Sequence, residues 1–193
     1  MSSRSRSSAA RLVAGLALLV TTAGCGIGAQ DRPDVVADAE SSAASPAATD
    51  TTKVPLTVQV YLLRGDHLVR VSRSVPDGTG LQPCLTGLFA DVAPTEVAAG
   101  LRTDLPKVTK VPSGQLVGPI AEVSMPTGFD RLSVRDQVGA MSQLVYTITS
   151  NTVATEVQLV SKGRDLPVPD GVGRILSRPV NPADYATWAP TGT

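Results

Sequence analysis

Cys25 is the side chain whose chemistry is predicted most directly by its sequence context. Arginines near the start of the chain are followed by an apolar run over residues 12–20, and small residues then lead into the cysteine. This order is typical of a bacterial lipoprotein signal, in which the thiol carries a diacylglycerol. The apolar run is too short to cross a bilayer as a helix. We therefore predict that residues 1–24 are a signal peptide and that Cys25 is the lipid attachment residue.

Acyl chains on Cys25, such as palmitate, would hold the mature chain at the extracytoplasmic face of the bacterial cell membrane. Two or three chains exceed what stable anchoring to a bilayer requires. The alternative is an ordinary signal peptide followed by a coincidental cysteine, because Thr22 stands where lipoprotein signals usually carry leucine or valine.

Residues 25–53 are predicted to be a disordered acidic tether. The segment is rich in alanine, serine and threonine, and it has too few large apolar side chains to offset its ordering entropy. Over residues 26–52 its charge comes from five carboxylates and one arginine: Asp31, Asp34, Asp38, Glu40, Asp50 and Arg32. Residues 54–193 then form a single domain. Its near-neutral charge argues against a nucleic-acid partner.

Other residues that could catalyse a reaction do not form a recognisable set. The one histidine, His67, falls in a predicted turn, and no Gly-x-Ser-x-Gly motif accompanies it. Glu96 and Glu122 could be the two carboxylates of a peptidoglycan hydrolase, but Glu96 fits equally well as a first-turn residue of a short helix. Carboxylates spread singly along the chain offer no metal site. We therefore expect neither enzyme activity nor a cofactor.

Cys84 is predicted to be a core residue. It shares helical spacing with Leu81, Leu85 and Leu88, and a free cysteine commonly behaves as a small buried hydrophobe. If Cys25 carries lipid, no partner remains for an intramolecular disulfide.

Three arginines and one tryptophan are the candidates for a partner surface. Arg102, Arg131 and Arg135 could form a patch that binds an anion or a partner, although charged residues on solvent-facing helix surfaces require no function. Trp188 follows the last predicted element. A large aromatic side chain at such a position either packs back on the domain or contacts a partner.

Apolar runs predict the strands. Residues 56–63 form a continuous apolar, β-branched and aromatic run, which predicts a central strand. Residues 67–75 are predicted to pair with it as a hairpin. Residues 108–123 are interrupted by prolines and glycines, which favours two short strands or one bent strand. Residues 156–160 alternate into a turn and predict a further strand.

Helical periodicity predicts the remaining elements. Helical periodicity begins at residue 80 and resumes briefly at Pro94, with Val97, Ala98 and Leu101 facing inward. It is strongest over residues 133–150, where Ser133 can cap the helix. The apolar stripe of this last helix is Val134, Val138, Met141, Leu144, Val145 and Ile148. Residues 179–188 are predicted to strap over the domain. The order indicates an α+β fold, a two-layer sandwich with two helices packed on one face of a small sheet.

Four segments resemble the GerMN domain, a family named after a spore germination and sporulation protein and found in many actinobacterial lipoproteins. These segments are Val58-x-Val60-Tyr61-Leu62, the Pro-Thr to Leu-Pro stretch over residues 94–106, Gln143-Leu144-Val145-Tyr146-Thr147, and the closing strand with its Gly163 turn. The likeness covers roughly residues 55–185. The chain departs from the family pattern at Ala93, at Ser124 and over residues 181–185.

This resemblance implies an α+β domain similar to the ring-building modules of secretion systems, which oligomerise or dock on other envelope proteins. It implies no catalytic residues. The leading hypothesis is therefore a lipid-anchored, non-enzymatic protein that docks on an unidentified envelope protein or on the cell wall. A peptidoglycan hydrolase and a small-ligand-binding lipoprotein are the alternatives. The second is disfavoured because few aromatic side chains are present to stack on a ligand.

Overall fold

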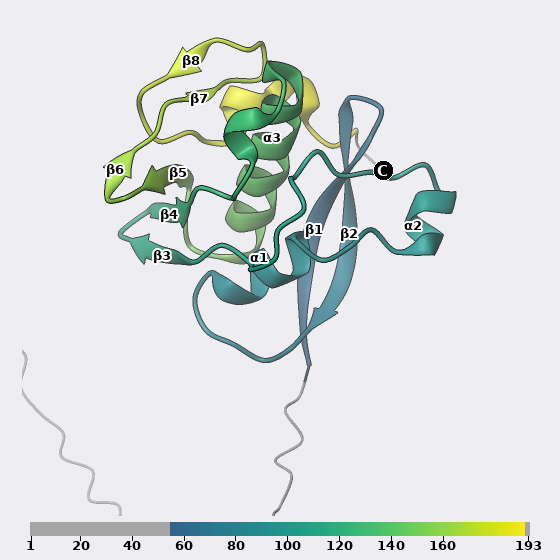
Figure 1. Cartoon of the computed structure of the whole chain (residues 1–193). Coiled ribbons are helices and arrows are strands. Elements are labelled where there is room, and N and C mark those ends of the chain that lie inside the picture. The colour runs from purple at the N-terminus through teal and green to yellow at the C-terminus, as the bar shows by residue number, and fades with distance from the viewer. Residues whose placement is uncertain (1–54, 192–193) are drawn as a thin grey trace, which may run out of the picture. The chain divides into compact units, whose positions relative to one another are not determined.

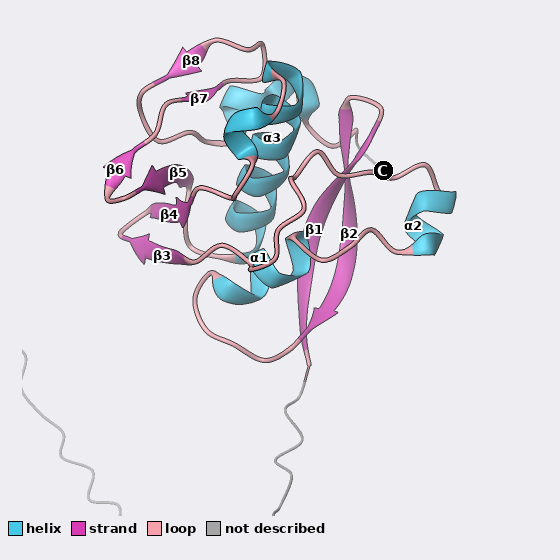
Figure 2. Ribbon diagram, in the orientation of Figure 1, coloured by secondary structure: helices cyan, strands magenta, loops and turns pink. Residues whose placement is uncertain are grey.

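The computed structural model describes residues 55–191, which lie within one compact unit over Thr49–Thr193. The predicted signal peptide, Cys25 and the acidic tether lie outside the described residues. Helices and strands alternate along the described part of the chain (Figures 1 and 2), so the predicted α+β class is confirmed. None of the helices in this part combines the length and apolar character that crossing a membrane requires.

Strands β1 (Leu56–Arg64) and β2 (His67–Val75) form the predicted hairpin. They pair antiparallel along their whole length, and the turn between them uses Gly65 at a φ of 59°. A glycine adopts this left-handed conformation without the steric cost that a Cβ would add. β1 is not central as predicted, because in the described part of the chain β2 is its only partner strand.

Two helices follow the hairpin, α1 (Gln82–Leu88) and α2 (Pro94–Ala98). Cys84 is 3% exposed in α1, which confirms its place in the core. α2 is a single turn, followed by Gly100 at a φ of 75°. Leu101 is buried as predicted, but Val97 is 59% exposed and Ala98 is exposed as well, so the inward placement predicted for these two residues was wrong. One helical turn is too short to bury all three residues against the same core.

Strands β3 (Gly114–Val117), β4 (Ile120–Ser124), β5 (Glu156–Ser161) and β6 (Arg164–Asp165) form a four-stranded sheet. β3 and β4 are the two short strands predicted for this region. β4 and β5 are parallel, and helix α3 (Val134–Asn151) provides the crossover between them. A parallel pair needs such a long connection.

The last third of the domain is built from short pieces. A 3₁₀ turn, η1 (Phe129–Arg131), precedes α3. Strands β7 (Val168–Pro169) and β8 (Ile175–Leu176) form a separate small sheet, and η2 (Pro182–Trp188) packs against α3 as the predicted strap. The strands in the described part therefore form three sheets instead of one.

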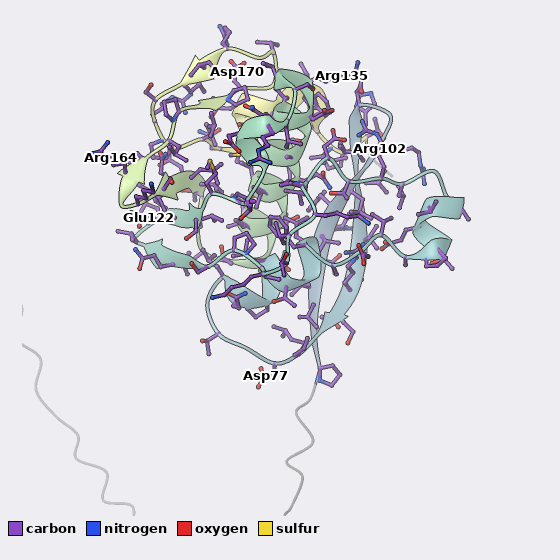
Figure 3. All side chains as sticks on the ribbon, viewed as in Figure 1. Asp77, Arg102, Glu122, Arg135, Arg164 and Asp170 are labelled. Atoms are coloured by element: carbon purple, nitrogen blue, oxygen red, sulfur yellow. The ribbon has the colours of Figure 1, made fainter. Side chains whose placement is uncertain are left out.

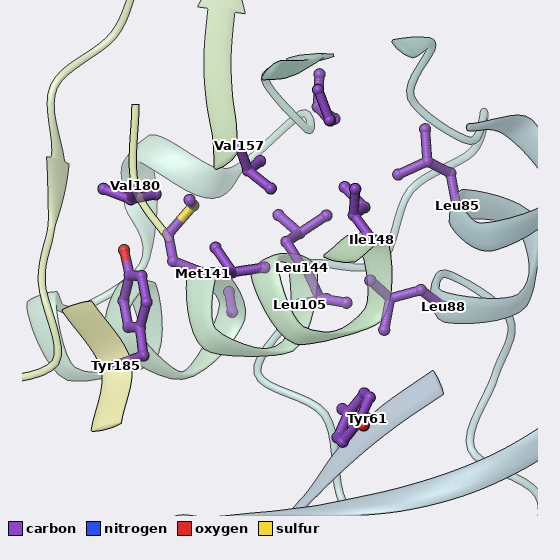
Figure 4. Close-up of a cluster of buried hydrophobic side chains, with 14 of the residues drawn as sticks. Tyr61, Leu85, Leu88, Leu105, Met141, Leu144, Ile148, Val157, Val180 and Tyr185 are labelled. Carbon is purple, nitrogen blue, oxygen red and sulfur yellow. The ribbon is translucent and has the colours of Figure 1, made fainter. Parts of the chain in front are cut away.

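Helix α3 is the central element, because it contacts β1, α1, β5, β7 and η2. Ser133 caps it by accepting a hydrogen bond from the Asp136 amide at 3.2 Å, as predicted. Val134, however, is 54% exposed, because it lies in the first turn before the helix enters the core. Figure 4 shows the α3 side chains Met141, Leu144 and Ile148 in one hydrophobic cluster with residues of other segments, which include Leu85, Leu88, Leu105, Val157, Val180 and Tyr185.

Candidate functional site

Arg102 and Arg135 come together at the tip of the β1–β2 hairpin, as Figure 3 shows. Arg102 Nη2 donates to the Gly65 carbonyl at 3.1 Å and its guanidinium also pairs with Asp104. Arg135 pairs with Asp66, the other residue of the hairpin turn. Both arginines are therefore exposed residues that contact the hairpin turn from one surface.

Arg131, the third candidate arginine, is exposed at the end of η1. Within residues 55–191 no hydrogen bond or ion pair joins it to Arg102 or Arg135. The structure thus brings two of the three predicted arginines together and leaves Arg131 separate from their ion pairs.

Trp188 is 7% exposed and belongs to the hydrophobic core. Its indole Nε1 donates to the Gly171 carbonyl at 3.0 Å, which satisfies the ring's one polar group. Tyr185 in the same turn is fully buried and donates to the Pro169 carbonyl at 2.7 Å. Of the two alternatives for Trp188, the structure therefore shows the ring packed back on the domain, and a burial of this kind does not support its place among the candidate partner-surface residues.

The two carboxylates proposed for a hydrolase are not brought together. Glu96 lies in α2 and Glu122 in β4, and these elements are on opposite sides of the domain in Figure 1. Glu122 accepts a hydrogen bond from Gln115 Nε2 at 2.7 Å on the outer face of the four-stranded sheet. In addition, the described residues contain no group of three metal-ligating side chains that could hold a metal ion.

Glu96 is instead part of a structural ion pair with Arg73 of β2. The Arg73 guanidinium makes two contacts with the Glu96 carboxylate, at 2.5 and 3.2 Å, and each side chain is only 11% exposed. Arg73 also donates to the carbonyls of Gly87 and Ala90 at the end of α1. Burial raises the pKa of Glu96, but the bonds from Arg73 and the Ala93 amide outweigh it and hold the pKa below its usual value.

Asp170 is a second carboxylate that serves the structure. Burial raises its pKa, but the amides of Arg174 and Val172 and the Arg174 guanidinium all donate to it and lower the pKa overall. Asp184 follows the same pattern, since hydrogen bonds from Arg178 lower its pKa more than burial raises it. All three carboxyl groups are therefore stabilised in the charged form.

Cys84 lies too deep in the core for reaction with a surface reagent. Burial raises the pKa of its thiol and so disfavours the reactive thiolate.

Polar side chains of α3 close the outer edge of β1, and sequence analysis missed this feature. Thr147 Oγ1 accepts from the Tyr61 amide at 3.1 Å, and Gln143 Nε2 donates to the Tyr61 carbonyl at 2.9 Å. Asn151 accepts from the Gln59 amide at 2.9 Å and donates to the Gln59 carbonyl at 2.7 Å. These helix residues are spaced by four, so they line one face of α3. That spacing of polar residues was the sequence signal that could have predicted a polar face on this helix.

A backbone bridge closes the same edge at Leu63. Leu63 and Arg102 exchange two hydrogen bonds of 2.8 Å between their amides and carbonyls. Gln143, which is fully buried, also accepts from the Asp104 amide at 2.9 Å and so fixes the segment that carries Arg102. The arginine surface at the hairpin tip thus depends on the closed edge of β1.

Comparison with known proteins places this domain among described families. The family model described as Germane, sporulation and spore germination, matches residues 43–167. The tandem GerMN domains of the sporulation protein GerM from Bacillus subtilis are 17% identical, with a TM-score of 0.45 over 58% of this chain and 41% of that one. The first GerMN domain of the same protein is 16% identical, with a TM-score of 0.43, and the match covers 57% of this chain and 86% of that one. No curated protein matches the chain.

Proposed function

The chain belongs to the Germane family of sporulation and spore germination domains, and we propose that it is a lipid-anchored docking module of the bacterial cell envelope. In this proposal the domain binds another envelope component and catalyses no reaction. Residues 1–24 direct export, Cys25 carries the lipid at the extracytoplasmic face of the membrane, and the acidic segment up to residue 53 links the anchor to the domain.

The observation that carries the non-catalytic part is the separation of the two candidate carboxylates, because Glu96 in α2 and Glu122 in β4 lie on opposite sides of the domain in Figure 1 and do not flank one site. A glycosidic hydrolase needs one carboxyl group with a raised pKa to protonate the leaving group. Glu96, Asp170 and Asp184 have lowered pKa values instead, because arginines and backbone amides hold them in the charged form. These groups stabilise the fold and are poor proton donors at neutral pH.

The anchoring part of the proposal can be tested with Cys25→Ala in the full chain. The thiol is the acyl acceptor in this hypothesis, so the variant should leave the detergent phase in a detergent-partition experiment and should not be labelled by palmitate in growing cells. A variant that is still cleaved at the same bond and still partitions with lipid would contradict the lipoprotein assignment.

The docking part is tested by incubating the full chain with labelled cell wall and by crosslinking it in living cells. We expect no release of soluble wall fragments, together with reproducible crosslinks to one envelope component. Release of fragments by the wild type that is lost in Glu122→Gln would instead support a hydrolase. The Arg178→Gln variant, altered at an exposed structural ion pair, is the control for nonspecific loss.

A further inference from the structure

The outer edge of β2 carries a row of backbone groups that point away from the hairpin. In β1 the backbone amides and carbonyls of Gln59, Tyr61 and Leu63 face away from β2, since they bind residues of α3 and Arg102 instead of β2. In an antiparallel pair, opposite residues alternate between pairs whose backbone groups bond to each other and pairs whose backbone groups point outward. The register of the hairpin therefore directs outward the amides and carbonyls of Leu68, Arg70, Ser72 and Ser74. Within residues 55–191 no hydrogen bond reaches them.

Two hollows lie along this edge of β2. One, of about 390 Å³, is lined by Leu68, Val69 and Arg70 together with Tyr61, Arg64 and the C-terminal residues Pro190 and Thr191. The other, of about 460 Å³, is lined by all residues from Val71 to Val75 and by residues of α1, α2 and the segment between them. Because consecutive β2 residues line each hollow, both faces beside the edge have room for the alternating side chains of an added strand.

The charges beside the two hollows differ. Arg64 and Arg70 line the first hollow, and within the described residues neither takes part in an ion pair. In the second hollow Arg73 is already neutralised by Glu96, and Asp91 is an exposed carboxylate. The edge of β2 is therefore positively charged near Arg70, whereas near Val75 it has no excess of positive charge.

We propose that β2 accepts an extended segment of a partner protein as an added antiparallel strand, with acidic side chains at the C-terminal end of that segment. This proposal rests on the docking function and names the surface that performs it. Main-chain hydrogen bonds to the edge would provide affinity, and the two hollows would select the side chains. Antiparallel pairing directs the C-terminal end of the added segment toward Arg70.

A second copy of this chain is a poorer match to the edge. β2 carries the basic residues Arg70 and Arg73 and has no acidic residue. Pairing β2 with β2 of another copy would therefore supply no carboxylate for Arg64 or Arg70. Charge complementarity favours an acidic partner strand.

The test uses the full chain in mild detergent and a fluorescent peptide, acetyl-Val-Thr-Val-Thr-Val-Asp-Val-Asp-amide, with fluorescence anisotropy as the readout. The wild type should bind this peptide saturably and should bind a copy with lysine in place of aspartate at least about ten-fold more weakly. Arg70→Glu should reverse this preference. Absence of saturable binding by the wild type would overturn the proposal.

Ser72→Pro tests the backbone edge directly. Its amide points outward, so proline removes an outward donor without breaking the hairpin ladder. Binding of the acidic peptide should weaken by about ten-fold or more, whereas the matched control Ser72→Ala should bind like the wild type. A second peptide, N-methylated on the amides that pair with the edge, should also fail to bind the wild type, which keeps the test decisive if Ser72→Pro does not fold.

Three further outcomes would overturn the proposal. Equal binding of the acidic peptide by Ser72→Pro and by the wild type would exclude the edge of β2 as the binding site. Concentration-dependent dimers that disappear in Ser72→Pro would assign the edge to a second copy. Equal crosslinking of the envelope component by both proteins would leave the docking function standing and place it on another surface.

Discussion

The β1–β2 hairpin has two outer edges, and the rest of the domain closes the edge of β1 while leaving backbone groups of β2 unpaired within the described residues. On β1, side chains from α3 and the Arg102 backbone satisfy the groups of Gln59, Tyr61 and Leu63. On β2, the corresponding groups point outward beside two hollows. An unpaired edge strand is a template for another chain, and natural proteins usually protect such edges.

This contrast teaches that closing an edge with a helix also fixes the position of that helix. The polar residues of α3 reach β1 only if the apolar face of α3 packs in one orientation. The bonds to the β1 edge and the packing of the core therefore require the same orientation of the helix. Within residues 55–191 no hydrogen bond from a helix binds the outward backbone groups of β2. Substitutions on the two edges should therefore differ in cost, and the following variants test this difference.

The largest effect is expected for Val145→Asp. Val145 is fully buried on the apolar face of α3, and an unpaired carboxylate there would remove both the core packing and the alignment that closes β1. Total stability of a domain is typically about 5–15 kcal/mol, so we expect the variant to be unfolded by circular dichroism. The control Arg135→Asp, on the exposed face, should cost under about 1 kcal/mol. Normal folding of Val145→Asp would contradict the helix orientation.

Gln143→Leu should be the most damaging change to the closed edge itself. Leucine fills a similar volume but leaves the Tyr61 carbonyl and the Asp104 amide without partners in a buried site. Each of these two groups costs about 1–3 kcal/mol, which predicts a loss of about 2–6 kcal/mol in the free energy of unfolding by urea. A loss below about 0.5 kcal/mol would show that the side chain does not close the edge.

Glu96→Gln should give a smaller, pH-dependent effect beside β2. The pKa of Glu96 is lowered in the folded state, so its contribution is present above the unfolded pKa of about 4.3 and is lost as the pH falls through the folded-state pKa. We expect a loss of about 1–2 kcal/mol at neutral pH. The difference in unfolding free energy between variant and wild type, measured by urea unfolding, should become smaller below about pH 4. A gap independent of pH would contradict the ion-pair account.

The smallest effect is expected for Ser72→Val on the open edge. Ser72 is exposed and loses only a hydrogen bond between its hydroxyl and Gln59, so the change in stability should stay within about 0.5 kcal/mol. The matched control is Thr147→Val, which removes the acceptor for the Tyr61 amide and should cost about 1–3 kcal/mol. Similar losses for both valine variants in thermal melts would remove the distinction between the edges.

Local patterns in the sequence were sufficient for most elements. The hairpin, the helix that begins after Ser133, and the buried Cys84 all follow from the spacing of apolar residues, and the structure confirms them. Such spacing determines which side of an element is apolar, because burial must match the period of a helix or a strand. The resemblance to GerMN domains likewise depended on short local segments, and the family match confirms it.

Only the tertiary structure decided which polar residues act together. Gln143, Thr147 and Asn151 bind backbone groups of β1 that are more than eighty positions away, and no local pattern specifies that distance. The same limit explains the burial of Trp188, whose indole bonds to a carbonyl in the loop between β7 and β8. Sequence periodicity determines the faces of elements, whereas contacts between distant segments determine which edges and side chains remain accessible to a partner.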